Sequence, residues 1–174
     1  MIFSEYQRAV LSYAMRRTEL AADAEDVAAE TFIICWRKLE AVPLDEPLPW
    51  LYAVARRVLA NQRRGRGRRE QLISVLRTRD VQTPVQLGED LDTPAFRALA
   101  SLNPADQELL RLVAWEELGH GEIARVLGIT PNAVAIRLHR ARARFAAALK
   151  DRTPSRTQTD VTGTERAVWT GEAS

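Results

Sequence analysis

The sequence has very few side chains of the kinds that bind metals or do catalysis. Its 174 residues include one cysteine, Cys35, and two histidines, His120 and His139. A single thiol excludes an intrachain disulfide and a cysteine-rich zinc site. There is also no phosphate-binding loop and no cluster of carboxylates, so a nuclease or hydrolase would have little to work with. We therefore expect no metal, no cofactor and no catalytic residue, and we predict that the protein is not an enzyme.

Long apolar runs and strand-like alternation are missing as well. No apolar stretch approaches the ~20 residues that span a bilayer, and no signal peptide opens the chain, so we expect a cytoplasmic protein without membrane insertion. Apolar residues nevertheless make up 46% of the chain, which is enough for a core and excludes wholesale disorder. These residues recur at helical spacing, and there is no internal repeat. The sequence predicts an all-α protein.

Charge is unevenly distributed along the chain. The net charge is only +2, yet residues 56–69 hold seven arginines and no acid, whereas residues 101–130 hold two arginines and five acids. Basic segments within a nearly neutral chain indicate a local site for a polyanion rather than general stickiness.

One stretch in the second half of the chain has the pattern of two helices around a tight turn. Ile123 and Leu127 lie on the apolar stripe of a short first helix. Gly128 follows at once, where a left-handed C-terminal cap favours a residue without a Cβ. Thr130 can cap the second helix, and Pro131 suits its first position. This pattern predicts a helix-turn-helix.

The second of these helices has an apolar side and a cationic side. Val134, Leu138, Ala141 and Phe145 recur at spacings of four, three and four, and we expect them to be buried. Residues 131–150 hold five Lys or Arg and no acid, as a helix that enters the major groove requires. An ordinary helical hairpin with a solvated basic face is the alternative. The residues expected to face DNA are Asn132, Ile136, Arg137, His139, Arg140 and Arg144.

The first half of the chain predicts two helices before a proline-rich loop. The first covers residues 3–20, and the second begins with Asp23 as its N-cap and ends near Glu40. Two isoleucines on the outer side of the second helix indicate that a partner covers them, although a helix wedged between two neighbours of its own domain fits as well. The inner side comprises Ala28, Phe32, Cys35, Trp36 and Leu39, and the outer side comprises Asp26, Glu30, Ile33, Ile34 and Arg37.

The proline-rich loop leads into a third helix. Residues 42–49 contain three prolines, which predicts a segment without regular helix. The third helix begins at Trp50, and we expect the glycines of segment 63–69 to end it. Aromatic rings interleaved with arginines and an amide can stack bases and hold the phosphates of a single strand, but a core tryptophan beside a solvated basic face fits at least as well. The candidates are Trp50, Arg56, Arg57 and Asn61, with Tyr52 and Arg63 beside them.

Composition divides the chain into four parts. Residues 1–70 form one helical domain, and residues 71–93 mix Gln, Thr, Asp, Pro and Gly as a flexible linker does. Residues 94–150 form a second helical domain that contains the helix-turn-helix. Residues 151–174 are rich in Thr, Ser, Gly and charge, and we expect this tail to be disordered.

Three segments, in this order, resemble bacterial sigma factors of the extracytoplasmic-function group, the small two-domain members of the sigma-70 family. Residues 23–37 resemble the helix that binds core RNA polymerase, and residues 49–57 resemble the −10 helix. Residues 101–144 resemble the C-terminal −35 domain. The resemblance covers roughly residues 3–70 and 95–149.

The resemblance implies a sigma factor that directs core RNA polymerase to −10 and −35 promoter elements and initiates transcription, in a response to stress or the environment. It implies the β′ clamp helices and the β flap of polymerase as partners, promoter DNA as a ligand, and an anti-sigma factor as a further partner of the family. Loop 42–49 corresponds to the segment that captures a flipped −10 base. The implied contacts are Asp26, Glu30, Thr31 and Ile34 to the clamp helices, Trp50, Arg56, Arg57 and Asn61 to the melted −10 strand, and the helix 131–145 to the −35 groove.

Several positions depart from the family pattern. Ala29 stands where the family usually has Gln, which removes one polar contact to polymerase, and Arg57 stands where Asn is frequent. Ala135 and Ile136 replace the usual Lys/Arg and Ser. Ile136 can touch a thymine methyl group, but a bare surface residue or an anti-sigma contact fits equally well. A stand-alone helix-turn-helix regulator that binds duplex operators without polymerase is the alternative function.

Overall fold

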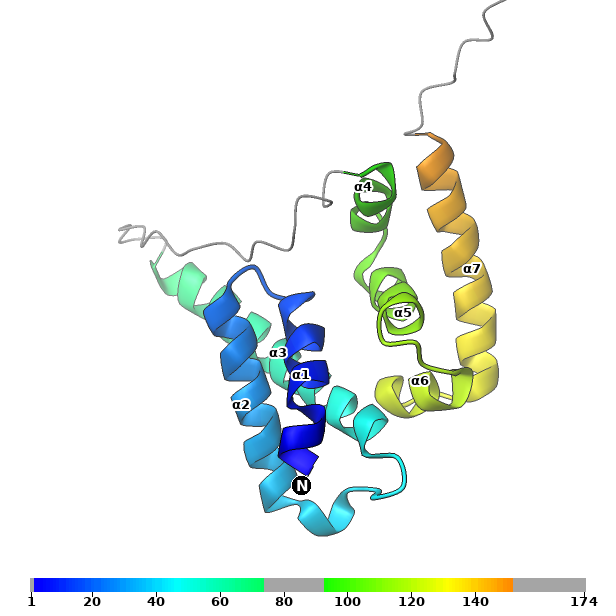
Figure 1. Cartoon of the computed structure of the whole chain (residues 1–174). Helices are drawn as coiled ribbons and strands as arrows, with labels where there is room; N and C mark the ends of the chain where they lie inside the picture. Colours follow the sequence, from blue (N-terminus) through cyan, green and yellow to red (C-terminus); the bar gives the residue numbers. More distant parts are fainter. Residues whose placement is uncertain (1, 74–92, 152–174) are drawn as a thin grey trace, which may run out of the picture.

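The chain consists of helices and loops throughout the residues that the computed structural model describes, 2–73 and 93–151 (Figure 1). The all-α prediction is confirmed. Most of the predicted linker and nearly all of the predicted tail lie outside the described residues. The helices are α1 (Ile2–Met15), α2 (Ala21–Arg37), the 3-10 helix η1 (Leu39–Ala41), α3 (Pro47–Ile73), α4 (Pro94–Ala100), α5 (Pro104–Ala114), α6 (His120–Leu127) and α7 (Pro131–Lys150).

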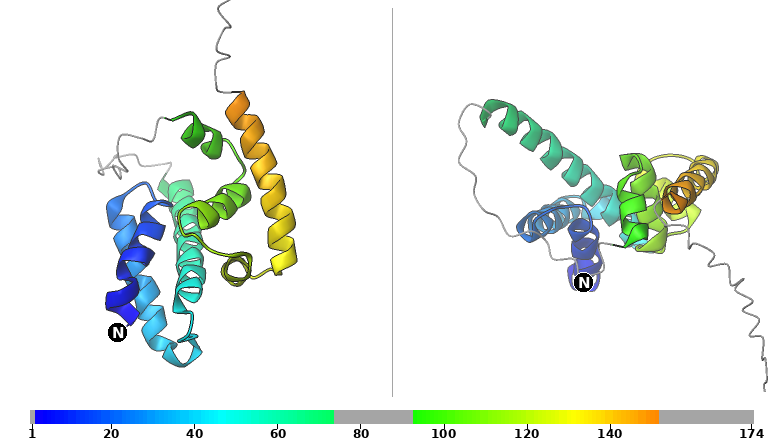
Figure 2. Two further views of the ribbon diagram at one scale, coloured as in Figure 1. Left: turned by 45° about the vertical axis from the view of Figure 1, so that its right-hand side comes forward. Right: turned by 90° about the horizontal axis from the view of Figure 1, so that it is seen from above.

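Helices α1, α2 and α3 pack together as the first helical domain (Figures 1 and 2). Each contributes residues with an exposed fraction of 1% or less, because apolar residues three and four positions apart share one helix face. The residues at the centre of this core are Val10, Tyr13, Val27, Leu51 and Val58.

The limits of these helices differ from the predicted ones in several places. Helix α1 ends at Met15 rather than near residue 20, and α2 starts at Ala21 after Leu20, whose side chain makes no capping bond, so the prediction of Asp23 as N-cap is wrong. Pro47 opens α3 within the segment predicted to be irregular, as proline can at a first helical position.

Helix α3 also continues to Ile73, through the two glycines that were expected to end it. A glycine inside a helix costs only about 1 kcal/mol relative to alanine, so it weakens a long helix without stopping it.

The second domain contains α4 to α7, and three of these helices begin with a polar cap followed by proline. The side chain of Asn103 accepts a hydrogen bond from the Asp106 N–H at 2.9 Å, and Thr130 accepts one from Ala133 at 3.2 Å. Thr93 caps α4 in the same way. These side chains satisfy backbone N–H groups that have no partner within the helix.

The helix-turn-helix forms as predicted. Gly128 ends α6 with φ of 67°, the left-handed conformation that glycine adopts without strain. In α7, Val134, Leu138 and Ala141 are buried, while Phe145 is only half-buried, so the predicted stripe shortens by one turn. Helix α7 lies on the side of the second domain away from α1 and α2 (Figures 1 and 2).

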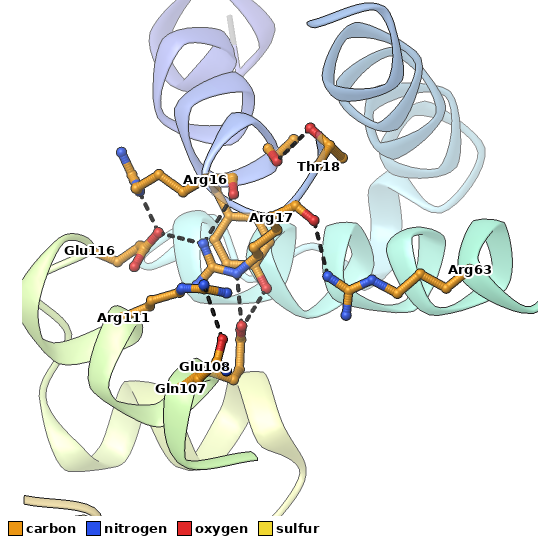
Figure 3. Close-up of polar contacts among 10 residues, drawn as sticks. Arg16, Arg17, Thr18, Arg63, Gln107, Glu108, Arg111 and Glu116 are labelled. Atoms are coloured by element: carbon orange, nitrogen blue, oxygen red, sulfur yellow. Dashed lines mark hydrogen bonds and ion pairs between the residues drawn. The ribbon is translucent and has the colours of Figure 1, made fainter. Parts of the chain in front are cut away.

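The two domains touch each other. Helix α3 of the first domain packs against α6 of the second, and buried apolar residues of both domains form one continuous cluster. Ion pairs from the end of α1 to α5 and to the loop after α5 add a polar part to this interface (Figure 3). The sequence contains no sign of this contact.

Candidate nucleic-acid interface

The outer face of α7 is open to solvent. Asn132, Ile136, His139 and Arg140 are all exposed, opposite the buried stripe. Ile136 keeps 46% of its surface exposed, and no described residue pairs with the guanidinium of Arg140. A helix that packs on its domain with one face and exposes cationic and amide groups on the opposite face has the form that major-groove contact requires.

Two arginines of α7 have additional surroundings that the helix pattern did not indicate. The Arg144 guanidinium lies 2.6 Å from a carboxylate oxygen of Asp106, which also accepts a hydrogen bond from Asn103. Its side chain remains 53% exposed, so it can still approach a phosphate, but part of its charge is already matched. Arg137 is exposed and lines a cleft between the two domains.

The four candidates for single-strand contact lie along α3. Arg56, Arg57 and Asn61 are exposed, whereas Trp50 is partly buried and packs against the core. Trp50 and Arg57 line a small cleft of about 200 Å³, which Glu46 and Arg125 also line. Trp50 therefore packs against the core with part of its side chain and leaves another part accessible in the cleft.

A larger cleft of about 940 Å³ lies between part of α3 and the second domain. Arg56, Arg57 and Asn61 line it, as do residues the sequence did not assign to a site. The cationic run 56–69 in the sequence indicated the residues that α3 contributes to this cleft. Nothing in the sequence indicates that the second domain faces α3. Arg63, which was expected beside the candidates, also lines the cleft. The cationic lining residues that the sequence did not assign are Arg17, Arg64 and Arg111.

Like charges in this cleft affect Arg111. Burial lowers the pKa of the Arg111 guanidinium, and the positive charges of Arg17 and Arg63 lower it further. Glu108 and Glu116 act on this pKa in the opposite direction. The cleft lining holds seven arginines and only two acids, Asp106 and Glu108, so its net charge is positive, which favours an anion.

Tyr52 is a core residue and not a base-stacking one. The residue is 3% exposed, and its ring stacks on that of Tyr13, with 4.8 Å between the ring centroids. Burial raises the pKa of Tyr52 to about 12, with a further contribution from Glu116, and burial likewise raises that of Tyr13. Both phenols stay neutral at physiological pH.

The outer face of α2 carries acids and apolar side chains together. Asp26 and Glu30 are exposed, Ile33 is 51% exposed, and Ile34 is partly buried against the core. Trp36 was expected inside the domain, but 80% of its surface is exposed, so that prediction is wrong. Leu39, at 48%, is misplaced in the same way.

Thr31 does not belong to this face. It is fully buried, and its hydroxyl donates a 2.7 Å hydrogen bond to the Val27 carbonyl. It lies five residues after Asp26, about 140° further round the helix, which turns it toward the core. A side chain with no exposed surface has nothing to offer a partner, so Thr31 is removed from the candidate contacts.

Within residues 2–73 and 93–151, no helix combines the length and apolar character needed to cross a membrane. In that same part of the chain, no group of three or more His, Cys, Asp or Glu side chains is placed to hold a metal.

Comparison with known families agrees with the division of the chain into two helical domains. Residues 2–69 match the family model "Sigma-70 region 2", and residues 95–145 match "Sigma-70, region 4". The chain is 31% identical over 144 residues to the ECF RNA polymerase sigma factor SigL of Mycobacterium tuberculosis, covering 79% of this chain and 81% of the relative. It is 28% identical over 149 residues to the RNA polymerase sigma factor YlaC of Bacillus subtilis, covering 81% and 86%.

Two solved structures share the fold. One is the sigma factor RpoE in complex with the anti-sigma factor NepR from Bartonella quintana, with a TM-score of 0.65 and 23% identity over 85% of this chain and 94% of that one. The other is CnrH in complex with the cytosolic domain of CnrY, with a TM-score of 0.60 and 24% identity over 86% of each chain. The chain therefore belongs to the sigma-70 family of RNA polymerase sigma factors, in its extracytoplasmic-function group.

Proposed function

We propose that this protein is a promoter-specificity subunit that binds core RNA polymerase in the cytoplasm, recognises −10 and −35 elements, and opens DNA by trapping unstacked bases. It has no catalytic chemistry of its own. The observation that carries the proposal is the free cationic face of α7, held by a buried stripe within a helix-turn-helix. The two functional domains span residues 1–70 and 94–150.

The −35 element is bound by α7 in the major groove. Arg140 and Asn132 reach base edges, Ile136 contacts a thymine methyl group, and the flanking cations hold phosphates. The exposure of these side chains supports this role. Arg144 contributes less, because Asp106 already binds it.

The melted −10 strand runs along α3. Arg56 and Arg57 hold its phosphates, Asn61 offers an amide to a base, and the accessible edge of Trp50 stacks on a base. The positive potential beside α3 supports this path.

Core polymerase is bound through the outer face of α2, which docks on the β′ clamp helices. Asp26, Glu30 and Ile33 are all exposed on this face, and the apolar surface of Ile33 would otherwise stay in water. Ile34 contributes its exposed part. The second domain contacts the β flap.

Run-off transcription on a library of genomic promoter fragments tests the proposal. Core polymerase with the protein should produce discrete transcripts from a subset of fragments, and core polymerase alone should not. A stand-alone regulator would instead shift duplex operators without polymerase and fail to co-purify with it. That pair of results would refute the sigma-factor function.

An anti-sigma factor is a further proposed partner, since RpoE was solved with one. A two-hybrid screen of a genomic library against the full chain tests it. A partner of this class should also reduce transcription in the run-off assay, and a screen that returns no such inhibitor counts against it.

A further inference from the structure

Arg17, in the turn just after α1, is buried between two acids of the second domain (Figure 3). Its Nε lies 2.8 Å from a carboxylate oxygen of Glu108, and its NH1 lies 2.9 Å from one of Glu116. The Arg17 side chain is 2% exposed, and that of Glu116 is fully buried. Residues 91 and 99 positions apart in the chain are thereby joined.

Neighbouring side chains complete the network. The Tyr13 hydroxyl donates a 2.8 Å hydrogen bond to Glu108, and the Arg17 guanidinium lies 3.5 Å from the centre of the Tyr13 ring. Arg16 shares the Glu116 carboxylate at 3.0 Å. Burial by itself would lower the pKa of Arg17, but Tyr13 and the two carboxylates together raise it, so this arginine stays charged inside the interface.

We propose that this network is an autoinhibitory latch, which holds the free protein closed and must open before both promoter elements can be bound. The latch itself is a property of the free chain. Its effect on promoter binding rests on the function proposed above.

The closed arrangement conflicts with promoter binding for a geometric reason. Elements centred about 25 base pairs apart lie about 85 Å apart on B-DNA, whereas α3 and α6 are in direct contact. Arg125 of α6 also pairs with Glu46, beside the cleft where Trp50 and Arg57 lie, so the second domain crowds one edge of the −10 surface. Twenty residues lie between α3 and α4. A chain of that length spans at most about 70 Å, so the covalent connection allows α3 and α6 to move apart.

Several buried polar atoms of the network lack a hydrogen-bond partner, which lowers the cost of separating the two domains. The second carboxylate oxygen of Glu116, NH2 of Arg17 and Nε of Arg111 are buried without a hydrogen-bond partner in the described part of the chain. Such groups lose hydration on closing and gain nothing in return. Repulsion among the arginines around the cleft also opposes closure. The two acids therefore hold the polar part of an interface whose other part is apolar, and a competing anion or partner can release this polar part.

Interdomain distances test the latch without DNA or polymerase. Spin labels on cysteines placed at the exposed positions Lys38 and Ala146, in a C35A background, report the separation of the domains by pulsed EPR. The parent protein should give one narrow distance peak. The variant E108A/E116A should give a broad distribution that extends to longer distances.

A matched control comes from the adjacent acid. Glu117 is exposed and has no bonded partner among the described residues, so E117A should leave the narrow peak unchanged. E108Q/E116Q, which keeps the side-chain volume, serves if the alanine variant loses helical content by circular dichroism. A broad distribution in the parent, or a narrow one in both charge-removed variants, would overturn the latch.

A binding measurement then separates the latch from the proposed function. A single-stranded oligonucleotide with a −10 sequence should bind E108A/E116A about tenfold more tightly than the parent, as expected if about nine-tenths of the parent molecules are closed. If the distances change but neither protein binds the oligonucleotide or core polymerase, the latch stands and the proposed function fails. Equal affinities with a clear change in distance would overturn the autoinhibitory role.

Discussion

Arg140 and Arg144 lie one helical turn apart on α7 and differ in their surroundings. Arg140 is free, whereas Arg144 binds Asp106, whose side chain is 10% exposed. Replacing Arg140 with alanine should weaken −35 duplex binding by about 1–3 kcal/mol without a change in melting temperature. Fluorescence anisotropy with a labelled duplex and a thermal melt measure the two quantities.

Two neighbouring substitutions serve as controls. R144A should lower the melting temperature slightly, by the equivalent of about 1 kcal/mol or less, since the pair is half-exposed. R142A removes the same charge from an exposed position on the flank of the helix and should weaken binding equally for all sequences. Sequence-independent loss in R140A as well would exclude Arg140 from base recognition.

Tyr52 makes the protein sensitive to alkali. Its pKa is about 12 in the folded protein and 10.0 in an ordinary environment, because burial disfavours the phenolate. The resulting stabilisation is complete below pH about 10 and is lost as pH rises toward 12, since the unfolded chain releases this proton first. Ultraviolet absorbance of tyrosinate should therefore show a step near pH 12 that Y52F lacks. A Tyr52 that titrates at its ordinary pKa would show that the interface with Tyr13 is open.

At the scale of single elements, the outer face of α2 separates binding from folding. I33D should abolish binding to core polymerase and leave helical content and melting temperature unchanged, because Ile33 is half-exposed. Co-purification with polymerase and circular dichroism measure the two effects. I136D makes the same chemical change at a similarly exposed isoleucine of α7 and should keep polymerase binding. Unfolding of I33D would place this side chain in the core.

Two glycines of the helix-turn-helix should respond to alanine in opposite directions. No atom lies within 4 Å of a Cβ added at Gly128 or Gly121, so only backbone conformation matters. Gly128 has φ of 67°, and G128A should destabilise the protein by about 1 kcal/mol. Gly121 lies within α6, and G121A should stabilise it by about 0.5–1 kcal/mol. Chemical denaturation curves give both values, and a change of the same sign in both would refute this account.

Local signals explain which elements could be predicted. Thr130, Pro131 and Gly128 determine a helix boundary through contacts within a few residues, and the predicted turn is present. Trp36 was misplaced because a large apolar side chain was assumed to be buried, whereas α2 turns it outward. The role expected for Thr31 came from family resemblance, and the position of this residue on the helix overrules it.

At the scale of the whole molecule, the sequence predicted two helical domains but not their contact. The pairing of Arg17 with Glu108 links residues 91 positions apart, and no periodicity or spacing encodes such a pair. The same holds for the cleft, whose cationic lining combines α3 with the second domain. The candidate residues on α3 and α7 could be listed from the sequence, but their closeness in the free protein could not.

The continuous core predicts how the molecule unfolds. Since one apolar cluster runs through both domains, calorimetry of the parent protein should show a single heat-absorption peak. E108A/E116A should separate it into two, because domains without a firm interface melt independently. E117A should resemble the parent. A double peak in the parent would mean that the interface contributes little to stability.

The start sites of the second domain have a consequence for folding order. Thr93, Asn103 and Thr130 each mark a helix start together with the proline that follows, whereas Leu20, before α2, makes no such bond. The second domain, which leaves the ribosome last during synthesis, therefore has the stronger local signals for starting its helices. We expect transient helical turns at these three sites in the denatured chain. The helices of the first domain should become stable only after their long-range contacts form.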